Sequence, residues 1–340
     1  MTIHSRNPRI AVAAVVFVLT MGLASPAGAH GVNGPPASNF ATEVHGIAPR
    51  QHTVVASLGP DRETVQLQST GRGRVTVFGY RGEPYLQLTP SGVWENRSSP
   101  AVALNRSRIP ATARPAARIA APRWVRISRT PAVSWHDHRT HWMGGATPGA
   151  VHRDRDQSHT ISRWKIPLEI DGRSAAITGS IVWHPPPAAW PWWILAIGLA
   201  GGVVLATRLR RGGLVIGGVL AIMALAEATH LWASWPFSNA SLGGRIGASL
   251  PSIGSIIAGI GAGVWVVRRG YRAAAPALIL AGLFVFVSGG VADLSTLSHA
   301  FVPSRLQPEQ ARLLVVLALG LGAGTATVGI LGLRAAPLTT

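Results

Sequence analysis

The pattern of apolar and polar residues changes character near Pro187. Before that point, short runs of alternating or β-branched residues recur between Gly/Pro turns, a pattern typical of antiparallel strands. The runs that predict strands are Thr53–Leu58, Thr64–Gln68, Arg74–Phe78, Tyr85–Leu88, Trp124–Ile127 and Ser162–Ile170. We therefore expect residues 30–187 to form an exported all-β, sandwich-like domain.

The clearest predicted unit in this domain is a β-hairpin. Asp171-Gly172 supplies the positive φ angles of a two-residue hairpin turn, and it joins the runs Trp164–Ile170 and Arg173–Trp183. The stretch Asn105–Arg123 contains three prolines among Ala and Arg, which is typical of a linker. A division of the β domain into two subdomains near 105–123 therefore stays open.

Five apolar runs follow a junction rich in proline and tryptophan, His184–Trp193. Each run can span a bilayer, so residues 188–340 are expected to form a five-helix transmembrane bundle. The runs are Trp192–Thr207, Leu214–Trp235, Ile246–Val267, Ala273–Ala292 and Leu313–Leu333.

The arginines between these runs predict an orientation in the plasma membrane. One side holds Arg208, Arg210, Arg211, Arg268, Arg269, Arg272 and Arg334, and the other holds Arg245, Arg305 and Arg312. Because cytoplasmic loops carry the excess of basic residues, the β domain is expected outside and the C-terminus in the cytoplasm.

Residues 1–29 have the features of a secretory signal peptide. A basic start precedes the apolar run Ile10–Ala24, and the small residues before His30 fit a signal-peptidase site. An uncleaved anchor is the alternative, although the apolar run is shorter than the roughly 20 residues that span hydrocarbon. Cleavage after Ala29 would make His30 the first residue.

The composition narrows the possible functions. The chain has 31 Lys+Arg and 13 Asp+Glu, yet only 13% of its residues are charged. Nearly all basic residues are Arg, and abundant Ala, Gly and Pro accompany them, so a GC-rich genome explains the charge and no nucleic-acid partner is predicted. The absence of Cys excludes disulfides, thiolate metal sites and iron–sulfur clusters. No nucleophile elbow, Walker loop, dinucleotide loop or zinc-protease motif is present, which weighs against an enzyme.

Three histidines lie within six residues of the β domain, at His136, His138 and His141. On a strand His136 and His138 share a face, and neutral imidazoles are common ligands of copper, zinc and nickel. The alternative is a structural polar cluster in which Asp137 pairs with Arg139 and the neighbouring tryptophans are buried.

Polar residues within the apolar runs form a second candidate site. Glu227 and His230 lie one helical turn apart, Asp293 ends the fourth run, and His299 follows it. The predicted topology puts all four at the outer membrane face, where they would make a mixed site for Cu(II), Zn(II) or a proton relay. Two alternatives remain: polar helix ends solvated by headgroups, and a haem held by His230 and His299.

An N-terminal His30 would offer its α-amine and Nδ1 together to copper. The Ala-His-Gly start resembles that of lytic polysaccharide monooxygenases and of CopC-type copper-resistance proteins. A helical region after such a domain is also similar in architecture to fused CopC/CopD proteins.

A broader resemblance covers most of the chain. It rests on Gly79–Leu86, Gly92–Pro100, Leu104-Asn105, Trp135–Trp142 and the Pro-Pro-Pro…Trp-Pro-Trp junction. In these segments the chain resembles uncharacterised actinobacterial multi-pass membrane proteins with an exported N-terminal β domain. The resemblance implies the architecture and no particular activity.

Together these features predict a membrane-anchored extracytoplasmic metal-binding protein, with copper sensing, delivery or uptake as its role. The expected partners are the lipid bilayer and a metal ion. A cell-envelope module that binds a protein or polymer without metal is the alternative, and a haem-binding membrane oxidoreductase is another. The candidate ligands are His30, His136, His138, His141, Glu227, His230, Asp293 and His299.

Overall fold

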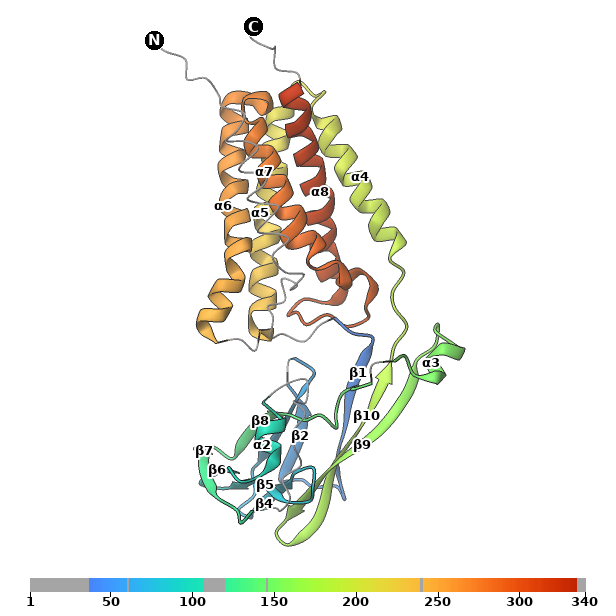
Figure 1. Cartoon of the computed structure of the whole chain (residues 1–340), viewed down its shortest axis with the longest axis vertical. Coiled ribbons are helices and arrows are strands. Elements are labelled where there is room, and N and C mark those ends of the chain that lie inside the picture. Colours follow the sequence, from blue (N-terminus) through green and yellow to red (C-terminus); the bar gives the residue numbers. More distant parts are fainter. Residues whose placement is uncertain (1–36, 60, 107–119, 145, 239–240, 335–340) are drawn as a thin grey trace. The chain divides into compact units, whose positions relative to one another are not determined.

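The computed structural model describes residues 37–59, 61–106, 120–144, 146–238 and 241–334 (Figure 1). These residues form two compact units, one of residues 38–186 and one that contains the helices from Pro187 onward. The predicted signal peptide, residues 1–29, lies outside the described residues.

The first unit is a pair of antiparallel sheets. The larger sheet has seven strands in the order β1 (Phe40–Ala48), β10 (Arg173–Trp183), β9 (His159–Ile170), β4 (Val75–Phe78), β5 (Pro84–Thr89), β6 (Gly92–Asn96) and β7 (Trp124–Ser128). The smaller sheet has the order β2 (Val54–Leu58), β3 (Thr64–Ser69) and β8 (Ala132–His136). Two short helices, α2 (Pro100–Leu104) and α3 (Gly149–Arg153), lie in the connections.

Alternate residues of both sheets share one hydrophobic core. The smaller sheet contributes Val65, Leu67 and Trp135, and the larger sheet contributes Val77, Leu86, Leu88, Ile166 and Leu168. Because successive strand residues point to opposite faces, this alternation produces the half-buried pattern seen in the sequence. The prediction of an antiparallel β domain is confirmed.

The predicted hairpin is also confirmed. Asp171 and Gly172 have φ angles of 49° and 78°, and Ile170 pairs with Arg173 across the turn. The sequence prediction omitted β1, β6 and β8. In β1 most side chains are only half-buried or exposed, because it is the edge strand beside β10, so its alternation carries little signal.

The strands on the two sides of residues 105–123 are not separate subdomains. The larger sheet takes β4, β5 and β6 from before this segment and β7, β9 and β10 from after it, while β3 pairs with β8. Residues 38–186 therefore form one unit, since each sheet needs strands from both halves. Residues 107–119 themselves lie outside the described residues.

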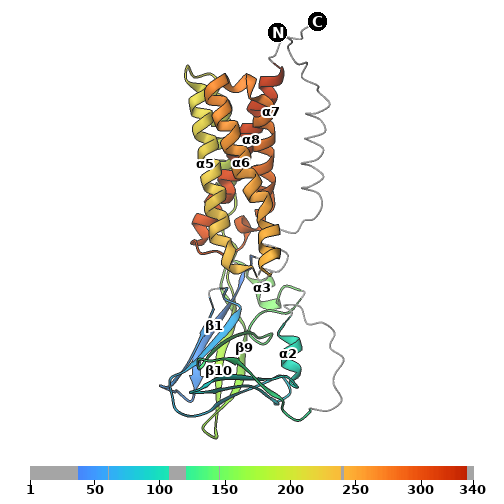
Figure 2. The same ribbon diagram turned by 90° about the vertical axis from the view of Figure 1, so that its left-hand side faces the viewer.

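The second unit has a helix at each of the five predicted apolar runs. They are α4 (Trp190–Ala206), α5 (Gly212–Ser234), α6 (Leu242–Ala273), α7 (Ala275–Val285) and α8 (Pro308–Arg334), with the short turns η1 (Trp235–Phe237), η2 (Phe286–Val291) and η3 (Leu294–Ser298). Figure 2 shows α5, α6, α7 and α8 side by side.

Three of the described helices are long and apolar enough to cross a membrane, namely 212–237, 242–273 and 308–334. The other two apolar helices, Trp190–Ala206 and Ala275–Val291, are shorter, so the predicted count of five spans is not established. Helix α4 ends at Ala206, before the turn to α5, and regular α-helix in the fourth run ends at Val285, where the π-helical turn η2 begins.

Helix α8 lies in the centre of this unit and packs against α4, α5 and α7. Small residues allow the backbones to approach closely: a Cβ at Gly320 would lie 2.6 Å from the Ala196 carbonyl oxygen. Large apolar side chains point outward instead, with Ile197 70% and Leu225 69% exposed. An apolar outer surface around a small-residue interior indicates association with a lipid bilayer.

Gly282→Ala is expected to destabilise the helical unit by about 1–3 kcal/mol, because it overpacks the α7–α8 contact. A Cβ at Gly282 would lie 2.5 Å from the Ala326 backbone nitrogen. Thermal unfolding of the full chain in detergent measures the effect. Gly202→Ala is the matched control, since a Cβ there meets nothing within 4 Å and alanine favours the helix. Equal losses in both variants would contradict this packing.

Candidate metal centre

The three clustered histidines of the β unit come together in space. Strand β8 ends at His136, the chain turns through Asp137–Thr140, and His141 follows. The ring centroids of His136 and His141 are 4.5 Å apart, and those of His136 and His138 are 5.0 Å apart. One ligand atom from each ring lies within 4.8 Å of the others, and this is the one such group of three or more ligands among the described residues.

Asp137 organises the turn that carries these rings. Its carboxylate is fully buried and accepts hydrogen bonds from Trp135 Nε1 at 3.0 Å and from Arg139 Nε and Nη2, both at 2.8 Å. Its carbonyl oxygen accepts from the backbone and hydroxyl of Thr140. The Asp137–Arg139 pair and the buried Trp135 are features of the structural polar cluster that sequence analysis gave as the alternative to a metal site. The same contacts also set the path of the chain between His136 and His141.

The charge state of Asp137 follows from these contacts. Burial alone would raise the pKa of its carboxyl, but the hydrogen bonds and positive charge of Arg139, together with the Trp135 hydrogen bond, lower that pKa below its usual value. Asp137 is therefore ionised at neutral pH. The guanidinium of Arg139 also lies over the ring of Tyr80, 4.7 Å from its centroid.

His138 is held in one orientation and one tautomer. Its Nε2 lies 2.9 Å from the carbonyl oxygen of Leu104, and its backbone N–H donates to Tyr80 Oη at 2.9 Å. Because a carbonyl oxygen only accepts, Nε2 carries the proton, and the neutral ring keeps a lone pair on Nδ1. That Nδ1 is buried and has no hydrogen-bond partner among the described residues.

Hydrogen bonds and ring contacts connect the histidine cluster to other segments of the β unit. Leu104 is the last residue of α2, so His138 satisfies one of the carbonyl groups that a helix end leaves unpaired. The hydroxyl of Tyr80 donates in turn to Asn105 Oδ1. After His141, Trp142 stacks on Phe40 of β1 with a centroid distance of 5.5 Å.

This arrangement has the features of a metal-binding site with three nitrogen ligands. A metal-bound histidine usually donates its other ring N–H to a carbonyl or carboxylate, as His138 does. Metal–nitrogen bonds of about 2.0–2.1 Å in tetrahedral geometry place the nitrogens roughly 3.3 Å apart, so modest ring rotations would suffice. Three imidazoles leave a fourth position for another ligand.

Sequence analysis did not identify the groups that orient the cluster. Leu104 and Tyr80 are 34 and 58 residues from His138, and neither carries a metal-ligand signature. The local sequence around Tyr80 and Leu104 therefore gave no signal that these residues meet His138.

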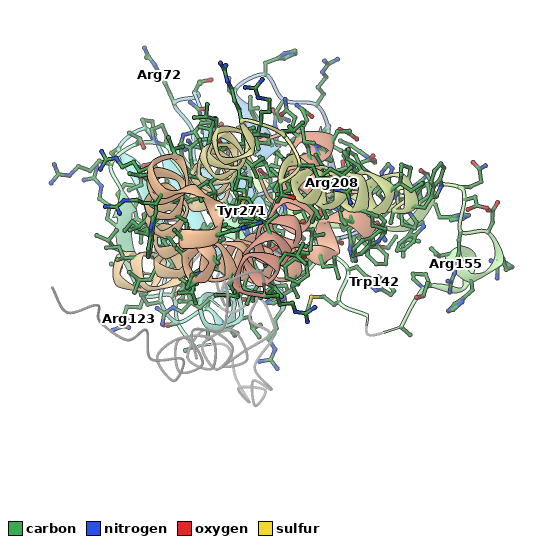
Figure 3. The ribbon with its side chains drawn as sticks, turned by 90° about the horizontal axis from the view of Figure 1, so that it is seen from above. Arg72, Arg123, Trp142, Arg155, Arg208 and Tyr271 are labelled. Carbon is green, nitrogen blue, oxygen red and sulfur yellow. The ribbon has the colours of Figure 1, made fainter. Side chains whose placement is uncertain are left out.

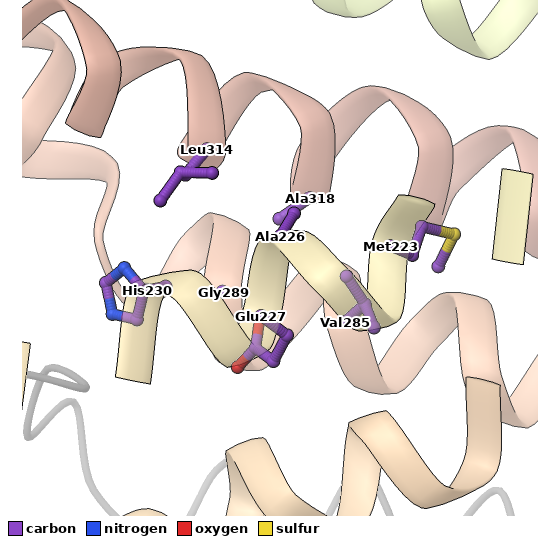
Figure 4. A pocket seen from close by; sticks show the side chains of 8 residues that line it. All are labelled: Met223, Ala226, Glu227, His230, Val285, Gly289, Leu314 and Ala318. Carbon is purple, nitrogen blue, oxygen red and sulfur yellow. The ribbon is translucent and has the colours of Figure 1, made fainter. Parts of the chain in front are cut away.

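The second candidate site is partly assembled. His230 Nε2 lies 3.2 Å from Asp293 Oδ2, and Glu227 lies one turn before His230 on α5 (Figure 4). Both carboxylates are buried, with Asp293 0% and Glu227 3% exposed. Glu227 packs against the π-helical turn η2, where a Cβ at Gly289 would lie 2.5 Å from Glu227 Oε2. π-Helical turns often occur where a functional or polar group must be accommodated.

His299 is engaged elsewhere. Its Nδ1 lies 2.7 Å from the Ser295 carbonyl oxygen, and its own carbonyl accepts from Arg312 Nη2 at 2.9 Å. The four expected residues therefore do not form a group whose ligand atoms lie within 4.8 Å of one another. The cavity beside Glu227 and His230 has a volume of about 10 Å³, room for about one water and too small for a haem. His30 lies outside the described residues.

Replacing His230 by alanine is expected to lower the thermal midpoint of the helical unit by roughly 5–10 °C. The change leaves the fully buried Asp293 carboxyl group without its ring partner, and a buried polar group that loses its partner costs about 1–3 kcal/mol. Thermal unfolding of the full chain in detergent measures it. His299→Ala is the control, since its ring contacts are at the surface; a shift as large in His299→Ala would refute the assignment.

Comparisons of the chain with protein-family models, curated proteins and solved structures find no match. The class of protein is therefore defined here by its own features: a β-sandwich unit with a three-histidine cluster, and a helical unit with three helices that could cross a membrane.

Proposed function

We propose that this protein is a membrane-anchored, extracytoplasmic binder of Cu(II), with His136, His138 and His141 as the ligands. The observation that carries the proposal is the arrangement at His138: the Leu104 carbonyl holds the proton on Nε2, Nδ1 is buried without a hydrogen-bond partner among the described residues, and one ligand atom from each of the three rings lies within 4.8 Å of the others. This is how a protein prepares an imidazole for a metal.

The choice of Cu(II) rests on the donor set. Three imidazole nitrogens suit Cu(II), Zn(II) and Ni(II), whereas calcium and magnesium prefer oxygen ligands. Among divalent first-row metals, Cu(II) binds a nitrogen site most strongly. The chain has no Cys, so it lacks the thiolates that favour Cu(I).

The role we assign is copper sensing, delivery or uptake. The β unit has a hydrophobic core to which both of its sheets contribute. Three protein ligands also leave a coordination position for exchange, unlike closed structural sites with four. A reversible site on a membrane-anchored domain fits an ion that is captured and passed on.

We further propose that all five helices span the plasma membrane, with the β unit outside. The asymmetry of the arginines supports this orientation. Trp190, Trp192 and Trp193 begin α4, where an interfacial aromatic belt is expected. Reporter fusions at Asp171 and Arg211 test the topology, and cytoplasmic-type activity at Asp171 would overturn it.

Metal binding is tested on the full chain purified in detergent and stripped of metal. Titration with Cu(II) against a competing chelator should give one ion per chain, and electron paramagnetic resonance should show nitrogen ligands. A variant with His136, His138 and His141 all changed to alanine should lose this binding. Binding that is absent from the natural chain, or equal in the variant, would leave the metal-free envelope module as the better proposal.

A further inference from the structure

One end of the helical unit carries a large excess of positive charge. Seven arginines come from the α4–α5 turn, the α6–α7 junction and the end of α8: Arg208, Arg210, Arg211, Arg268, Arg269, Arg272 and Arg334. Packing places these segments together, because a Cβ at Gly213 would lie 3.4 Å from the Val266 carbonyl oxygen and one at Gly332 would lie 3.5 Å from Arg272 Cα. Figure 3 views this end along the helices, with Arg208 and Tyr271 labelled.

No acidic side chain of the described helices balances this charge. Glu227 and Asp293 lie with His230, and Glu309 in the first turn of α8 pairs with Arg312 at 3.0 Å. All seven arginines are exposed, and none makes an ion pair within the described residues. Within the part of the chain that the structure describes, these seven guanidinium groups are therefore available to an external anion.

A groove on α6 concentrates part of this charge beside an apolar surface. Its volume is about 510 Å³, and it is lined by Gly261, Val264, Trp265, Arg268, Arg269 and Ala273. Directly after Arg269 the helix is interrupted at Gly270, whose φ of 78° is unfavourable for other residues, and the chain turns away there. The guanidinium groups of Arg268 and Arg269 therefore lie at the end of the regular, apolar part of α6.

The neighbouring side chains indicate which anion would bind there. Trp265 is 41% exposed, and the indole ring is favoured at the headgroup level of a membrane. Ile257 and Ile260, further along α6, are 66% and 56% exposed and would lie against acyl chains. Guanidinium groups pair well with phosphate oxygens. A free phosphate would use the arginines only, whereas a lipid matches the apolar surface as well.

We propose that the groove around Arg268, Arg269 and Trp265 binds the headgroup phosphate of an anionic phospholipid. Arg268 and Arg269 hold the phosphate, Trp265 packs beside the headgroup, and the acyl chains lie along α6. This inference does not depend on metal binding by the β unit, so either can fail without the other.

The test uses the full chain, delipidated in detergent, and native mass spectrometry. Titration with phosphatidylglycerol and with phosphatidylcholine of the same acyl chains should show tighter binding of the anionic lipid. Each basic residue near anionic lipid contributes about a factor of 5 in affinity, so R268Q/R269Q should weaken phosphatidylglycerol binding about 30-fold and leave phosphatidylcholine unchanged. R268K/R269K keeps the charge and should retain most of the preference.

The charge-matched control is R163Q/R173Q, which removes two exposed arginines from the β9–β10 hairpin. It should leave lipid binding unchanged, and the thermal midpoints of all variants should match that of the natural chain. Equal binding of the two lipids by the natural chain, or an equal loss in R268Q/R269Q and R163Q/R173Q, would overturn the proposal. Inorganic phosphate that binds as tightly as the lipid would overturn it as well.

Discussion

Replacing His138 by alanine is expected to weaken Cu(II) binding by the full chain at least about 100-fold, because even changes to groups behind a metal ligand cost about 10–100-fold. His138 is the ring whose proton position is set by the Leu104 carbonyl, with Nδ1 left to bind the metal. Competition titration in detergent measures the affinity, and electron paramagnetic resonance should show one fewer nitrogen ligand.

His52→Ala is the matched control for this prediction. His52 is exposed in the same unit and is not part of the cluster, so its loss should leave the affinity within about twofold. If His138→Ala and His52→Ala bind Cu(II) equally well, the three rings are packing groups and not ligands.

The second large effect is expected at Asp137. Asp137→Ala should destabilise the β unit by about 3–5 kcal/mol, since it removes a fully buried carboxylate and leaves the half-buried guanidinium of Arg139 without its ion-pair partner. Trp135 Nε1 also loses its acceptor. Thermal unfolding followed by tryptophan fluorescence measures the loss, and Asp137→Asn, which keeps an acceptor oxygen, should lose less.

The control for this substitution is Asp154→Ala, where the side chain is exposed and surface changes cost less than about 0.5 kcal/mol. A fall of similar size in Asp154→Ala would contradict the role given to Asp137. Asp137→Ala should also weaken Cu(II) binding, because the turn between His136 and His141 depends on its hydrogen bonds.

The pKa of Asp137 predicts the pH dependence of this contribution. Its folded-state pKa is lowered, so the ionised carboxylate is favoured in the folded state and its stabilisation is present above the ordinary pKa of about 3.9. The stabilisation is lost as the pH falls from there through the folded-state pKa. The difference in thermal midpoint between the natural chain and Asp137→Asn should therefore stay constant above about pH 5 and shrink as the pH is lowered below about 4.

Much of the architecture could be predicted from local patterns. The alternation of side chains locates most strands of the β unit, and Asp171-Gly172 locates its hairpin, because both depend on neighbouring residues. The omitted strands show the limit of such patterns: β1 is half-exposed, and it is a strand because β10 lies beside it. The number of helices long enough to span a membrane shows a similar limit, since hydropathy does not register the change from α-helix to the π-helical turn at η2.

The amino-acid sequence alone was enough to predict the candidate histidine ligands and the division of the chain into a β unit and a helical unit. Three histidines within six residues, and the change from strand to helix patterns near Pro187, are properties of consecutive residues. Which side chains contact one another became known from the three-dimensional fold. In the fold, His138 contacts the Leu104 carbonyl and the Tyr80 hydroxyl, and His230 pairs with Asp293. The ring of His299 contacts the Ser295 carbonyl instead. The physical reason is that a hydrogen bond or ion pair depends on separations of about 3 Å between atoms, which folding sets through contacts distant in the chain.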